Sequence, residues 1–208
     1  MVSAEELQDA LADITMQTYN RTMELVTAPL DQQQMLWTAI PLFIATLFMI
    51  LYFARYRKEE LGWNTAFGNT MVFMFAGISI VREMYEQGGN LDILFANELY
   101  TLLCIGLIAW GTLLMFFTYF HLMPKKFAFF VLSAPPINVT VYVIMTIVYA
   151  NVVPDYITVL AAVVLLVLIL VLAKMLQFVL KVFGLEYIEK IAIVGGLAEK
   201  KEKPRGRS

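Results

Sequence analysis

The sequence predicts an all-α integral membrane protein built on a five-helix transmembrane bundle, and three observations support this fold class. Hydrophobic residues make up 60% of the chain, mean hydropathy is +0.72, and several long stretches carry no charge. A hydrocarbon core of ~30 Å needs about 20 apolar residues in a helix, because lipid offers no hydrogen-bond partner to exposed backbone. The predicted spans are 35–54, 61–81, 99–122, 127–153 and 157–183, the last uncharged as far as residue 173.

Residues 1–34 precede the first span and are predicted to form an extracytoplasmic amphipathic helix. Ser3 and Glu6 match a capping box, and apolar residues recur at helical spacing until Pro29, where we expect the helix to stop. Since the segment is acidic, packing on the outer ends of the spans is expected rather than binding to anionic lipid. A partner-binding or lid helix is the alternative. Asn20 begins a glycosylation sequon inside this helix, and we do not expect it to be modified.

Lysine and arginine are distributed unevenly between the two sides of the predicted bundle. Thirteen follow span one, span three or the uncharged part of span five, which ends at residue 173, whereas only Arg21 and Arg82 fall on the other side. By the positive-inside rule this distribution predicts an N-terminus outside the cell membrane and a cytoplasmic C-terminus, with residues 35–183 as the transmembrane domain. Residues 184–208 are predicted to form a cytoplasmic interfacial helix and a basic tail that contacts anionic lipid. The tail lacks the stacking aromatics of a nucleic-acid site.

The second span, 61–81, is the least apolar of the five. Thr65, Asn69 and Ser79 fall along one side of a helix with a period of 3.6 residues. Small and hydrogen-bonding side chains allow helices to approach closely in lipid. We therefore favour a helix-packing stripe, with a polar path for a solute or ion as the alternative.

The fourth span contains two adjacent prolines near its middle. Pro135 and Pro136 lack the N–H groups that would bond to the carbonyls of Val131 and Leu132, so the helix should kink or break there. Non-helical backbone at this depth must be satisfied by protein or water, and we expect Asn138 to contribute. A packing kink is favoured over a substrate site, because transporters usually carry such breaks in pairs.

Charged residues gather at the predicted outer ends of spans two and three. Arg82, Glu83 and Glu98 are expected to form an interfacial cluster, with Arg82 paired to Glu98. Charges at helix ends mostly solvate the membrane boundary, and we favour that interpretation over a cation-attracting vestibule or an acid/base pair.

No catalytic, metal-binding or cofactor motif is recognisable in the chain. The single histidine, His121, has no second histidine or carboxylate cluster beside it, and the single cysteine, Cys104, lies within a span. We find no nucleophile elbow, no phosphate-binding glycine loop and no His-Glu-x-x-His sequence. We therefore predict no catalytic residue, no metal and no cofactor.

These observations leave three function classes for a multi-pass membrane protein. The leading hypothesis is a non-catalytic scaffold or small subunit, bound to other membrane subunits or to a second copy. A channel or transporter that uses span two and the broken span four comes second. A lipid-modifying enzyme comes third, and it would require Glu98, Arg82 or His121.

Overall fold

The structure is a computed structural model that describes residues 3–55, 61–89 and 98–183, and all regular secondary structure in these ranges is helical. The helices are α1 (Ala4–Asp31), α2 (Gln33–Arg55), α3 (Trp63–Gly88), α5 (Glu98–Tyr119), α6 (Lys125–Val131), α7 (Ala134–Tyr149) and α8 (Tyr156–Phe183). Four of them, α2, α3, α5 and α8, are long and apolar enough to cross a membrane, and the bent pair α6 and α7 makes a fifth span if counted as one. The expectation of a helical protein with several helices long and apolar enough to cross a membrane is confirmed for the described residues.

Three helix ends differ from the predicted spans by more than two residues, and one of them is that of α7, which ends at Tyr149 instead of residue 153. α3 continues past Val81 to Gly88, and Gly89 ends it with a φ of 71° while its N–H bonds to the carbonyl of Tyr85. Glycine adopts this left-handed conformation at little cost, which is why helices often end there. α5 ends at Tyr119, before the predicted end of span three at residue 122. The predicted interfacial helix and basic tail, residues 184–208, lie outside the described residues.

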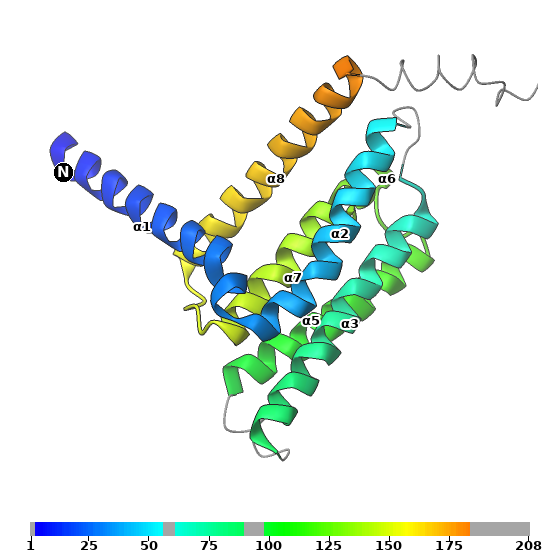
Figure 1. Cartoon of the computed structure of the whole chain (residues 1–208), viewed down its shortest axis with the longest axis horizontal. Helices are drawn as coiled ribbons and strands as arrows, with labels where there is room; N and C mark the ends of the chain where they lie inside the picture. Colours follow the sequence, from blue (N-terminus) through cyan, green and yellow to red (C-terminus); the bar gives the residue numbers. More distant parts are fainter. Residues whose placement is uncertain (1–2, 56–60, 90–97, 184–208) are drawn as a thin grey trace, which may run out of the picture.

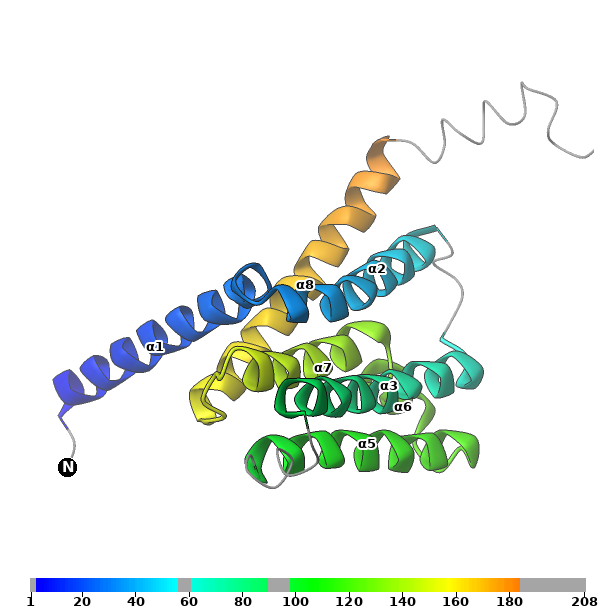
Figure 2. The ribbon, with the colours of Figure 1, turned by 60° about the horizontal axis from the view of Figure 1, so that its bottom comes forward.

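Four helices form a layered body, and two others cross on one side of it (Figures 1 and 2). Within the body, α2 packs on α7, α7 packs on α3, and α3 packs on α5. α1 lies across the body, and its first half extends beyond the other helices (Figure 1). α8 packs on α1 and α7 where it begins and diverges from α2 and α7 towards its C-terminal end.

The contact between α3 and α5 is the most extensive in the molecule and depends on two glycines. A Cβ added at Gly111 would lie 2.7 Å from the Cβ of Phe73, and one at Gly77 would lie 2.5 Å from the Cγ1 of Ile108. No real side chain tolerates such distances without movement of its neighbours. The absence of a side chain at both positions therefore allows the two helices to approach closely, as small residues do in membrane proteins generally.

The capping box at the start of α1 is confirmed. The Glu6 N–H donates to Ser3 Oγ at 3.1 Å, and the Ser3 N–H donates to Glu6 Oε2 at 2.8 Å. The bond from the Ser3 N–H lowers the pKa of the Glu6 carboxyl. The prediction that Pro29 ends the helix is wrong, because α1 continues to Asp31.

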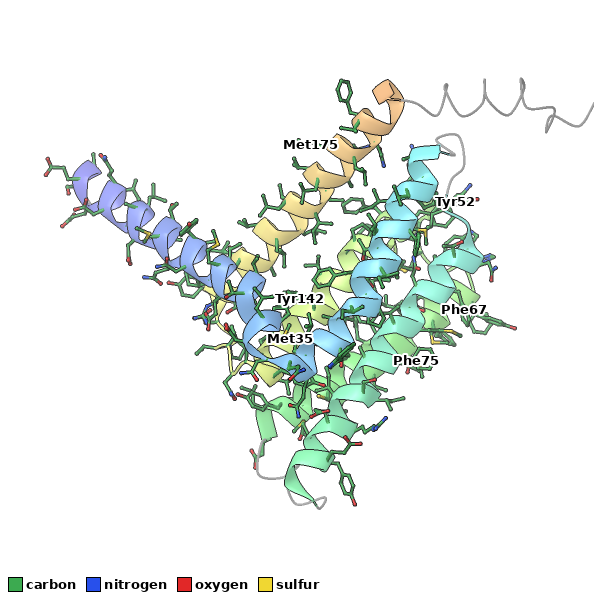
Figure 3. All side chains as sticks on the ribbon, viewed as in Figure 1. Met35, Tyr52, Phe67, Phe75, Tyr142 and Met175 are labelled. Atoms are coloured by element: carbon green, nitrogen blue, oxygen red, sulfur yellow. The ribbon has the colours of Figure 1, made fainter. Side chains whose placement is uncertain are left out.

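A neighbouring helix compensates for the proline inside α1. Pro29 has no N–H to donate to the carbonyl of Leu25, one turn earlier. The Tyr142 hydroxyl of α7 donates to this carbonyl instead, at 2.6 Å. Both Leu25 and Tyr142 are buried, so α1 is attached to the body at the position where its own hydrogen-bond ladder is interrupted (Figure 3).

The chain bends by 45° between α6 and α7. Pro135 and Pro136 lie in the first turn of α7, which begins at Ala134 after the N-cap residue Ser133. The first N–H groups of a helix have no intrahelical partner, so prolines in this turn remove little. The two prolines therefore begin a new helix instead of kinking a continuous one.

Candidate functional site

Asn69 of α3 lies against the break between α6 and α7. Its Nδ2 donates a hydrogen bond of 2.8 Å to the carbonyl oxygen of Leu132. In an unbroken helix this carbonyl would accept from the N–H of residue 136, which is a proline and has none. Asn69 therefore supplies the missing donor from another helix. We expected Asn138 to serve the break, but its amide is directed to α2.

Asn138 of α7 is buried and bonds to α2. Its Nδ2 donates to Thr46 Oγ1 at 2.6 Å and to the carbonyl of Leu42 at 3.3 Å. The Thr46 hydroxyl in turn donates to the carbonyl of Leu42 at 2.8 Å. This small network joins the middle of α2 to the first turns of α7. Its polar groups would otherwise lack hydrogen-bond partners in an apolar environment.

The other two residues of the predicted polar stripe lie in different environments. Thr65 is half-buried near the start of α3, whereas Ser79 is exposed towards its end. Between them, Asn69 is half-buried and Ala76 is buried. The structure thus brings Asn69 to a partner helix and does not bring all three polar residues, Thr65, Asn69 and Ser79, to one surface.

A groove with a volume of about 380 Å³ lies between α2, α7 and α8, and Val26 of α1 contributes to its wall. Its walls are almost entirely aliphatic and aromatic. The polar residues in the wall are Thr46, Asn138 and Tyr142, and each is engaged in the hydrogen bonds described above. The volume is within the range of about 300–1,000 Å³ typical of ligand pockets. The chemistry of the wall suits an apolar ligand.

The predicted charge cluster at the ends of α3 and α5 has a different pairing from the expected one. Arg82 Nε lies 2.7 Å from Glu86 Oε1, one turn later on the same helix, and the Arg82 side chain is 76% exposed. The expected pair between Arg82 and Glu98 does not form, because Glu86 is one helical turn away, the spacing at which side chains on a helix meet. Glu83 is half-buried and Glu98 is exposed.

A second ion pair, which the sequence analysis missed, joins α1 to the start of α8. Arg21 Nη2 lies 3.4 Å from Asp155 Oδ2, and Arg21 Nη1 lies 3.0 Å from Glu24 Oε2. Asp155 also accepts the N–H and the hydroxyl of Thr158. The backbone bond from Thr158 is the main cause that lowers the pKa of Asp155, and Arg21 adds to it. One feature of the sequence could have indicated this ion pair: Arg21 is the single basic residue before residue 55.

His121 takes part in an aromatic stack at the opposite end of the body. The centroids of the His121 and Trp63 rings are 4.4 Å apart, with 28° between the ring planes. Phe129 packs against Trp63 in a T-shaped arrangement, with 5.2 Å between the ring centroids. His121 has a φ of 54°, in the left-handed region. The histidine thus joins the α5–α6 connection to the start of α3 through ring contacts.

In the described ranges, no group of three or more His, Cys, Asp or Glu residues is placed to hold a metal ion. Every buried side-chain nitrogen and oxygen in these ranges has a hydrogen-bond partner. Comparison of the chain with models of protein families, with curated proteins and with solved structures found no match.

Proposed function

We propose that this chain is a non-catalytic scaffold or small subunit of a complex in the cell membrane. The observation that carries the proposal is the use of its intramembrane amides: Asn69 bonds to the carbonyl of Leu132 and Asn138 bonds to Thr46 and the carbonyl of Leu42. A solute path needs polar groups that are free to meet the solute. These amides instead hold helices together, which supports a structural role.

The proposed orientation has five spans, with the N-terminus outside and the C-terminus in the cytoplasm. It rests on the thirteen Lys and Arg residues that follow span one, span three or residue 173 of span five, against two on the other side. The count of five treats α6 and α7 as one bent span. In this orientation α1 lies on the outer side of the membrane.

The first half of α1 is the proposed contact surface for a partner subunit. Leu7, Leu11 and Leu25 fall on one face of the helix at 3.6 residues per turn. Leu25 is fully buried against the body, whereas Leu7 and Leu11 are 56% and 57% exposed. The apolar stripe that attaches α1 to the body therefore continues beyond it, where a second protein can cover it.

The charge of the same segment indicates the chemistry of this partner. Glu5, Glu6, Asp9 and Asp13 point away from the stripe, towards the opposite side of the helix, and no basic residue precedes Arg21. Anionic lipid would be repelled by this acidic side. The complementary partner is a membrane subunit with an apolar contact surface and a net positive charge.

Native mass spectrometry of the full chain, gently solubilised from its own membrane, tests this proposal. We expect a complex of constant stoichiometry that the double variant Leu7→Ser and Leu11→Ser loses. Met16→Ser is the matched control, because Met16 is 61% exposed on the opposite side of α1. An unchanged complex in the double variant would reject α1 as the contact surface.

A flux assay tests the transport alternative directly. Vesicles that contain the purified chain alone should show no more ion or solute flux than empty vesicles. Flux that Asn138→Leu abolishes, at an unchanged melting temperature, would overturn the scaffold proposal in favour of a channel.

A further inference from the structure

The groove lies between α2, α7 and α8. α2 and α8 are each long and apolar enough to cross a membrane, and α7 is so together with α6. The groove exists because α8 diverges from α2 and α7 after its first turns (Figures 1 and 2). A groove of about 380 Å³ with aliphatic walls, open to a bilayer, is filled by hydrocarbon more favourably than by water. The Thr46 hydroxyl and the Asn138 amide nitrogen are hydrogen-bonded to each other, so neither group needs a polar partner from the occupant.

The distance from the C-terminal end of α2 to the middle of the groove matches one leaflet of a bilayer. Thr46, in its wall, precedes Arg55, the last residue of α2, by nine residues. At 1.5 Å per residue this is about 14 Å of helix, and half of a ~30 Å hydrocarbon core is about 15 Å. A chain that starts at the membrane surface near Arg55 would therefore end close to Thr46 and Asn138.

A lysine lies at the surface end of the groove. Lys174 is exposed on α8, next to Ala173 in the groove wall, and α2 ends at residue 55 at the same end of the molecule (Figure 1). At the other end, Glu24 and Asp155 surround Arg21 at the junction of α1 and α8. These charges favour an anionic headgroup at the Lys174 end.

We infer that this groove binds one acyl chain of an anionic glycerophospholipid, with the headgroup beside Lys174 and the end of the chain near Asn138. The inference does not depend on the partner proposed for α1. It adds a resident lipid to the molecule, held by shape along the groove and by charge at its surface end.

Lipid binding by the purified full chain tests the inference. Native mass spectrometry with an equimolar mixture of phosphatidylglycerol and phosphatidylcholine should show one retained lipid, with at least a fivefold preference for phosphatidylglycerol. Lys174→Gln should bring this preference close to one. Lys126→Gln, a change of the same charge at an exposed position on α6, should leave it unchanged.

Filling the groove gives a second arm of the test. Ala173→Phe should lower retention of both lipids at least fivefold, while Ala109→Phe, at an exposed position on α5, should not. Melting temperatures of both variants show whether the fold survives. Because Ala173→Phe could unfold the protein, crosslinking of wild-type protein by phosphatidylglycerol with a photoreactive acyl chain provides a readout without any variant.

Two results would overturn the inference. One is crosslinks spread evenly over the exposed faces of α5 and α2 instead of the groove residues of α2, α7 and α8. The other is a lipid-free dimer that Ala173→Phe converts to monomers, which would show that a helix of a second copy occupies the groove.

Discussion

The α3–α5 pair and α8 show two opposite ways in which an apolar helix can sit in this molecule. α3 and α5 contain glycines at Gly77 and Gly111 and lie so close that neither position admits a Cβ. α8 contains no glycine, is built mostly of Ile, Leu and Val, and leaves a groove beside α2 and α7. Lipid tails are as apolar as leucine, so aliphatic side chains alone give helices little reason to associate. Small residues and interhelical hydrogen bonds determine where this bundle is tight.

Adding a side chain between α3 and α5 should have the largest effect on stability. Gly111→Leu places a side chain where even its Cβ would lie 2.7 Å from Phe73, and we expect a loss of about 3 kcal/mol or a failure to fold. Thermal unfolding in detergent, followed by size-exclusion chromatography, measures the loss. Gly106→Leu is the control, because nothing lies within 4 Å of a Cβ at that position. Equal melting temperatures for the two variants would contradict the assignment of α3–α5 as the tight contact.

Removal of the donor at the helix break should have the next largest effect. Asn69→Leu leaves the fully buried carbonyl of Leu132 without its partner, and we expect a cost of about 1–2 kcal/mol. Chemical or thermal unfolding checks the value. Ser79→Leu, at an exposed position of the same helix, should change stability by less than about 0.5 kcal/mol. A cost for Ser79→Leu as large as that for Asn69→Leu would count against the structural role of Asn69.

Weakening the attachment of α1 to α7 should lower stability by less than Gly111→Leu or Asn69→Leu. Tyr142→Phe removes the hydroxyl that donates to the carbonyl of Leu25, and we expect a loss of about 1 kcal/mol. Hydrogen exchange of the α1 backbone should accelerate around Thr22 and Leu25, while exchange in α3 and α5 stays the same. Tyr119→Phe, on a side chain that is 69% exposed, is the control. Uniform acceleration in all helices would show that the hydroxyl supports the whole bundle.

Acidification should give the smallest and most local effect. The pKa of Asp155 in the folded protein lies below its ordinary value of 3.8, so the carboxylate contributes stability above pH 3.8, and this contribution is lost as pH falls through the folded value. Hydrogen exchange at the junction of α1 and α8 should therefore be constant from pH 7 to about pH 5 and accelerate at lower pH, relative to the intrinsic rates. Asp155→Asn should show the accelerated exchange at all pH values. A pH dependence that persists in Asp155→Asn would assign it to another group.

Contacts within one helix can be predicted from the sequence, whereas contacts between residues far apart along the chain cannot. The capping box between Ser3 and Glu6 spans three residues and was predictable, because its partners are placed by one turn of helix. The ion pair of Arg82 was assigned to Glu98 on another helix, whereas the structure pairs it with Glu86 on its own helix. The donors to the carbonyls of Leu25 and Leu132 come from residues 117 and 63 positions away, and no local pattern specifies them.

The sequence by itself determined that this protein is helical, that several helices are long and apolar enough to cross a membrane, and approximately where each helix lies. Bilayer thickness and backbone hydrogen bonding act on each segment separately. The sequence also located the proline break, since Pro135 and Pro136 lack N–H groups in any context. Only the tertiary structure decided which side chain donates a hydrogen bond to each carbonyl that a proline leaves without its helical partner, and where the groove opens. These features depend on which helices become neighbours, and in lipid that choice is made by shape and by a few hydrogen bonds rather than by hydrophobicity.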